Sequence, residues 1–265
     1  MDDRAKVAKL AQTYGPRIYS LALRMCGNDA DAQDVVQDTF LQAHRKWKQF
    51  RGDSDPGTWL YTIAARRCKR AYLGKRPRGG AVPKYMHLVP FADRTVADVP
   101  LDEPDGVERQ VRREEVEAVE QAIARLPVDF RLPLVLKDVV ELSLAEVGEV
   151  LGIRPETVKT RVHRARLLLR AAMMRSVRRQ RPAPNPTYER SVCLDLLGAK
   201  LSAMDAGRGE ALPQDVVCER CRAVFAELDM TQAACARLSS GSLPLALRRE
   251  LDKHLGTSRP RRASK

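Results

Sequence analysis

Apolar residues recur every three to four positions along most of the chain, and no long stretch alternates apolar and polar residues as a strand does. A first helix is predicted up to about Met25, and a second opens between Asn28 and Asp31. Asp55 followed by Pro56 is typical of an N-cap and a first-turn proline, so a third helix is expected there. The pattern predicts an all-α protein.

The helical pattern stops between Gly74 and Gly106, where proline and glycine are frequent, and resumes at about Val107. Prolines interrupt it again near residue 182. We therefore expect two small helical domains joined by a flexible linker, followed by a short helical C-terminal extension. The boundaries are 1–73 for the first domain, 74–106 for the linker, 107–180 for the second domain, 181–190 for a second linker and 191–255 for the extension.

The strongest local signal lies in the second domain. Ser143 and Glu146 form a capping box, in which each side chain satisfies a free backbone amide at a helix start. Gly152 closes this short helix, and Pro155 opens the next one. Two short helices joined by a tight turn that contains glycine predict a helix-turn-helix.

The outward face of the second of these helices indicates what it binds. No acidic residue occurs from Thr157 through Tyr188. The face offers side chains of the kind that reach base edges and phosphates in a major groove: Arg154, Glu156, Thr157, Lys159, Thr160, Arg161, His163 and Arg164. With 47 Lys and Arg against 34 Asp and Glu, the net charge of +13 also favours a polyanionic partner. A solvated basic face on a helical hairpin is the alternative.

Three stretches, in order and with matching spacing, resemble extracytoplasmic-function sigma factors over about residues 10–72 and 107–175. Residues 31–43 are similar to the polymerase-docking helix of that family. Phe50-Arg51-Gly52 with residues 58–64 resembles the segment that opens DNA at the −10 element. Residues 126–127, 143–152 and 157–166 resemble the −35-reading domain. The sequence departs from the family at Pro56, where an apolar or aromatic residue is common, and at Arg66, where Asn is common.

The resemblance implies a protein that binds core RNA polymerase and promoter DNA and is not an enzyme. It also suggests an anti-sigma factor as a further partner. Polymerase contacts are expected from Asp31, Asp34, Gln37, Asp38 and Phe40, although Phe40 also fits the core. The −10 contacts are expected from Arg66, Arg67, Lys69 and Arg70. The −35 contacts are expected from Arg154, Glu156, Thr157, Lys159, Thr160, Arg161 and Arg164. Trp59 is assigned to packing rather than to base stacking.

The extension contains four of the six cysteines. Cys218 and Cys221 have the two-residue gap that lets both thiolates bind one zinc ion. The arrangement resembles the zinc-binding helical domain of anti-sigma factors, so we expect a zinc site formed by Cys193, Cys218, Cys221 and Cys235, with His254 as another candidate for the fourth ligand. A thiol switch and plain packing remain alternatives. An extension of this kind is expected to regulate the two sigma domains.

Other function classes explain less of the chain. A stand-alone helix-turn-helix regulator leaves the acidic helix and the Trp59 segment without a role. A pure interaction scaffold is a third option, which is discriminated by whether the chain confers transcription on core polymerase. An enzyme is disfavoured because the four histidines lack metal-ligand spacing and no phosphate-binding glycine loop or nucleophile motif occurs. Because the sequence also lacks a signal-peptide core and an apolar run of about 18 residues, we expect a cytoplasmic protein without a membrane partner.

Overall fold

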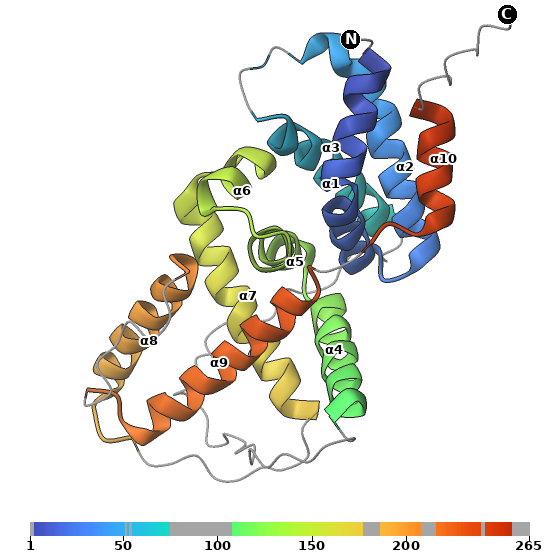
Figure 1. Ribbon diagram of the computed structural model, residues 1–265. Helices are drawn as coiled ribbons and strands as arrows, with labels where there is room; N and C mark the ends of the chain where they lie inside the picture. The colour runs from blue at the N-terminus through green and yellow to red at the C-terminus, as the bar shows by residue number, and fades with distance from the viewer. Residues whose placement is uncertain are drawn as a thin grey trace, which may run out of the picture.

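The computed structural model describes residues 3–50, 52, 55–74, 108–176, 186–207, 216–239 and 242–255. Every regular element in these ranges is helical, and the order of helices gives the two domains and the extension shown in Figure 1. The predicted all-α class is therefore confirmed. Apart from Gly74, the first predicted linker lies outside the described ranges, and so does the first half of the second, residues 181–185. None of the described helices has the length and apolar character needed to cross a membrane.

The first domain consists of α1 (Asp3–Cys26), α2 (Asp29–Lys46), the short 3₁₀ segment η1 (Trp47–Gln49) and α3 (Pro56–Gly74). The side chain of Asn28 caps α2 by accepting a hydrogen bond from the Asp31 amide at 3.0 Å. Asp55 accepts one from the Gly57 amide at 2.7 Å, at the start of α3. Both helix starts lie where the sequence predicts them, because each is fixed by a local cap.

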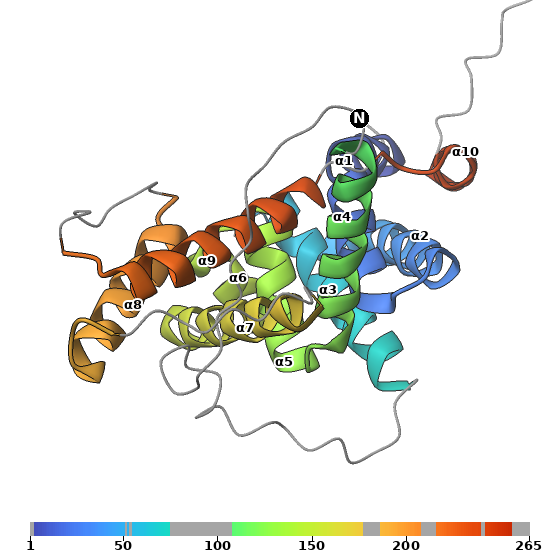
Figure 2. The same cartoon turned by 90° about the horizontal axis from the view of Figure 1, so that it is seen from below.

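The second domain consists of α4 (Glu108–Arg125), α5 (Val128–Leu134), a π-helical segment η3 (Val135–Val139), α6 (Leu144–Leu151) and α7 (Pro155–Ser176). Pro127 separates α4 from α5. The second domain packs closely against the first: α3 lies beside α5 and α6 in both views (Figures 1 and 2), and one continuous apolar core includes buried residues of α1, α2, α3, α4, α5, α6 and α7.

The extension consists of α8 (Arg190–Asp205), α9 (Glu219–Arg237) and α10 (Leu245–Leu255). It is packed onto both domains. Helix α9 crosses α7 and α4, whereas α10 lies along α1 and α2 on the far side of the molecule (Figures 1 and 2). The apolar pattern of the extension predicts helices over residues 192–204 and 216–228. Helices α8 and α9 lie there, but α9 continues nine residues past Leu228, and α10 was not predicted.

Candidate promoter-reading and polymerase-binding surfaces

The helix-turn-helix is built by local hydrogen bonds around α6. The Ser143 hydroxyl accepts from the Glu146 amide at 3.2 Å, and the Glu146 carboxylate accepts from the Ser143 amide at 2.7 Å. Hydrogen bonding of the Glu146 carboxylate with the side chain and the backbone amide of Ser143 lowers the pKa of Glu146 below its ordinary value. Gly152 ends α6 with φ 67°, the left-handed conformation that favours glycine. The predicted capping box and glycine turn are both confirmed.

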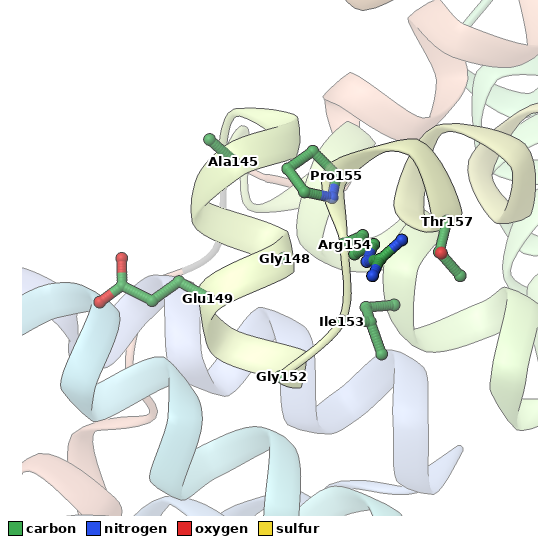
Figure 3. A pocket seen from close by; sticks show the side chains of 8 residues that line it. All are labelled: Ala145, Gly148, Glu149, Gly152, Ile153, Arg154, Pro155 and Thr157. Carbon is green, nitrogen blue, oxygen red and sulfur yellow. The ribbon is translucent and has the colours of Figure 1, made fainter.

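A surface pocket of about 650 Å³ lies beside the turn between α6 and α7. Figure 3 shows the Arg154 side chain directed toward Thr157, whereas the carboxylate of Glu149 points away from both. Most of the predicted −35 contacts are solvent-accessible on the first three turns of α7 or just before it. Arg154, Glu156, Thr160 and Arg164 are exposed, and Thr157, Lys159 and Arg161 are half-buried. These side chains form one polar surface, as a reading helix requires.

The opposite side of α7 is ionically bound to the extension. His163 Nε2 lies 2.7 Å from Asp205 of α8, so this histidine does not belong to the free outward face. Arg166 is 2% exposed and bonds two carboxylates at 2.7 Å, Asp138 of η3 and Asp205. Burial alone would lower the pKa of Arg166, but the two carboxylates outweigh burial and raise it. This guanidinium is permanently charged.

A second buried ion pair lies one helical turn further along. Arg170 of α7 pairs with Glu227 of α9, and their side chains are only 7% and 5% exposed. Sequence reasoning missed this face. Its signal is the spacing of His163, Arg166 and Arg170, three cationic or ionisable residues at steps of three and four, which places them on one side of the helix.

In the first domain, some predicted contact residues are exposed, and others are bonded to another side chain of the protein. Arg66, Lys69 and Arg70 of α3 are exposed. Arg67 bonds Asp38 of α2 at 2.7 Å and the Gln42 side chain at 3.1 Å. A predicted DNA contact and a predicted polymerase contact are thus paired with each other across α2 and α3, and the pair leaves Asp38 about half exposed, at 52%.

The other predicted polymerase contacts lie along α2. Asp34 is exposed, and Asp31 and Gln37 are half-buried. Phe40 is 0% exposed and belongs to the core, so its prediction as a polymerase contact is wrong in this arrangement. The same helical spacing that brings acidic residues to one surface turns Phe40 inward with Val36.

Trp59 packs on the core as predicted. It is half-buried, and its ring lies 5.9 Å from Trp47 and 5.1 Å from Phe50. The three rings fix the end of α2 against the start of α3, next to Gly52. The resemblance to sigma factors implies a pocket for an unstacked base in the loop of residues 52–55, of which Asp53 and Ser54 lie outside the described residues.

One cavity, of about 360 Å³, brings together cations from the two domains. Arg66 and Lys69 of α3 line it together with Arg161 of α7. Two other contacts join the first domain to the second: Arg131 donates a hydrogen bond to the Met25 carbonyl at 3.1 Å, and Arg24 pairs with Glu120 at 2.8 Å. Residues assigned to separate promoter elements are therefore neighbours in this arrangement.

Three of the predicted zinc ligands meet. The thiol sulfurs of Cys193, Cys218 and Cys221 lie within 4.8 Å of one another, and all three residues are buried. Burial opposes ionisation of Cys218, but hydrogen bonds from the backbone amides of Cys221 and Thr187 help to lower its pKa. Within the described ranges, no fourth His, Cys, Asp or Glu joins them.

Cys235 does not belong to this group, and its prediction as a ligand is corrected. It lies on the same helix as Cys221, fourteen residues further on, which at 1.5 Å per residue is about 21 Å along the axis. Cys235 instead packs in the core shared by the two domains. Burial raises the pKa of its thiol, and the nearby charge of Asp138 raises it further. His254 is exposed on α10.

Comparison with known proteins covers both domains. The family model Sigma-70 region 2 matches residues 10–78, and Sigma-70, region 4 matches residues 116–169. The chain is 36% identical to the ECF RNA polymerase sigma factor SigW of Bacillus subtilis, over 63% of this chain and 89% of SigW. It is 34% identical to the RNA polymerase sigma-H factor of Pseudomonas aeruginosa, over 62% of this chain and 84% of that protein.

Among solved structures, CnrH in complex with the cytosolic domain of CnrY is 23% identical, with a TM-score of 0.46, over 64% of this chain and 93% of CnrH. Neither family model extends into α8, α9 or α10. The identity to SigW, which holds over nearly its whole length, together with both region models, shows that the chain belongs to the ECF RNA polymerase sigma factors.

Proposed function

Sigma factors are non-enzymatic transcription regulators that bind core RNA polymerase and promoter DNA, and we propose which surfaces of this chain make these contacts. The outward face of α7 reads the −35 element, with Arg154, Thr160 and Arg164 as its exposed centre. The basic face of α3 binds the −10 region through Arg66, Lys69 and Arg70, and Asp34 and Asp38 of α2 contact the polymerase. The capped α6–α7 helix-turn-helix, with its exposed polar face, is the observation that carries this proposal.

Run-off transcription with core polymerase over a promoter library tests the assignment. We expect transcripts that start at specific promoters, in the cytoplasmic setting where the chain would act. A chain that binds core polymerase but gives no promoter preference would contradict the assignment of base reading to α7.

We further propose that the extension holds the two promoter-reading domains together and so limits transcription. The −10 and −35 elements are about 25 base pairs apart, which is roughly 85 Å at 3.4 Å per base pair. Arg66 and Arg161, assigned to these two elements, line one cavity in this structure. We call this packing of the two domains against each other the closed arrangement. Both elements can therefore be read together only after the domains separate.

The contacts of the extension support this proposal. Helices α8 and α9 bind α7 through Asp205 and Glu227. The next segment reaches the first domain, where the buried Ser20 hydroxyl donates a hydrogen bond to the Leu238 carbonyl at 2.7 Å. Helix α10 then buries Leu247 and Leu251 in the core that includes α1 and α2. One continuous segment thus bridges both domains.

A pair of matched substitutions on α10 tests this role. Leu251 is 3% exposed and Leu245 is 72% exposed. Leu251→Asp places an unpaired charge in the core and should release α10, so promoter-specific transcript should increase. Leu245→Asp adds the same charge to the same helix without disturbing packing and should leave the transcript level unchanged. Equal transcription from both variants and from the parent chain would refute a limiting role for α10.

We also propose that Cys193, Cys218 and Cys221 bind zinc. Three buried sulfurs within 4.8 Å of one another fit the thiolate set of a structural zinc site, and they join the start of α9 to α8. Zinc would contribute to the stability of a small core that contains few apolar residues. Elemental analysis of anaerobically purified protein should give about one zinc per chain. Cys218→Ser should remove it and Cys235→Ser should not; metal-free parent protein would leave the thiol switch or plain packing.

A further inference from the structure

The cavity between the two domains has the composition of a ligand site. Its volume of about 360 Å³ lies within the range of small-molecule pockets, roughly 300–1,000 Å³. One wall is apolar and comes from α3, α5, α6 and the turn before α7. Its apolar members are Ala65, Val128, Leu132, Pro133, Val150, Leu151 and Ile153. A cavity of this size with an apolar wall and a few polar groups matches the usual form of a small-molecule site.

The charged side chains of the cavity are not paired. Arg66, Lys69 and Arg161 supply three positive charges, and Asp129 and Glu149 supply two negative charges. Within the described part of the chain, none of these five side chains has an ion-pair or hydrogen-bond partner. By contrast, charged side chains at the helix–helix contacts described above form ion pairs. Cations from two different domains that face one cavity repel each other when it is empty. A bound anion would remove that repulsion.

We propose that this cavity binds a small phosphorylated molecule of about nucleotide size. Its phosphate groups would lie against Lys69, Arg66 and Arg161, since guanidinium and ammonium groups form charge-assisted hydrogen bonds with phosphate oxygens. An aromatic or apolar moiety would pack on the wall around Leu132 and Ile153. Asp129 would accept hydrogen bonds from hydroxyl or amino groups of the ligand.

Such a ligand would favour the closed arrangement. The site exists only while α3 and α7 lie on one cavity, so a molecule that binds there stabilises the closed state over the separated one. Binding itself depends only on the cavity, whereas an effect on transcription rests on the proposed function. Binding is therefore measured on the full chain without polymerase or promoter, which keeps failure of the two proposals distinguishable.

Calorimetric titration with ADP as the probe tests the site, with adenosine as the probe that lacks phosphates. ADP should bind with a 1:1 stoichiometry and adenosine more weakly. Lys69→Glu should weaken ADP binding by about tenfold or more, because a charged hydrogen bond is replaced by repulsion. Arg70→Glu is the matched control: it is exposed on the same helix, makes the same change in net charge and does not line the cavity.

Glu149→Gln provides a prediction of opposite sign. Removal of this negative charge should tighten ADP binding by about threefold, the size of a screened charge–charge interaction. A residue needed only for folding would not change binding in this direction. The absence of saturable ADP binding, equal weakening by Lys69→Glu and Arg70→Glu, or binding of a DNA oligonucleotide but not of ADP would each overturn the proposal. The last result would assign these cations to DNA phosphates alone.

Discussion

Glu227→Ala is the most informative perturbation of the interface between α7 and the extension. It removes the carboxylate that pairs with Arg170, and both side chains are more than nine-tenths buried. An arginine left without its partner in a buried position typically costs about 3–5 kcal/mol. That cost can be avoided only if α9 moves away from α7 and lets water reach Arg170. The variant should therefore open the closed arrangement.

Asp229→Ala is the matched control on the same helix. Asp229 bonds Lys200 at 2.6 Å and is 51% exposed, whereas the Lys200 side chain is 10% exposed, so water can replace the lost carboxylate from the Asp229 side and the loss should cost less than that of Glu227. Denaturant unfolding followed by circular dichroism gives the change in unfolding free energy, and hydrogen exchange shows whether α9 amides lose protection first. Equal effects of the two substitutions, with α9 still protected, would refute the claim that α9 is bound to α7 through a buried charge.

Further predictions concern the two sigma domains. Ser143→Ala should cost about 1 kcal/mol by denaturant unfolding. Because the folded pKa of Glu146 is lowered, its capping contribution is present above the unfolded pKa and is lost as pH falls through the folded pKa, which an acid titration of helicity would show. Asp34→Lys should weaken binding to core polymerase without loss of helix by circular dichroism. Arg164→Ala should relax preference at one −35 position, whereas Lys159→Ala should weaken all sequences alike, as a binding library would show.

The sequence predicts most of the helix-turn-helix because its determinants are local. The Ser143 box, the glycine at 152 and the proline at 155 each act within four residues of the helix end that they fix. The same holds for Asn28 and α2. Caps of this kind are readable without knowing what the helix packs against.

The interface with the extension could not be predicted in the same way. Arg166 and Asp205 are 39 residues apart, and nothing in either segment alone indicates the other as partner. Three leucines at a spacing of four could have indicated α10: Leu247, Leu251 and Leu255. The position of Cys235 also follows from the length of α9 alone, because one helix cannot bring residues fourteen apart to one ion.

The buried charges of this interface suit a contact that forms and separates. When α9 leaves α7 as a unit, Arg170 and Glu227 are both hydrated again, so the energy lost by parting the pair is largely recovered from water. An apolar interface of the same area would gain no such compensation on opening. Substitution of a single partner is costly because the remaining charge stays buried, whereas release of the whole extension exposes both. In the closed arrangement, a buried charge that lacks its partner is therefore strongly disfavoured. A competing partner can still separate α9 from α7, as a regulated sigma factor would require.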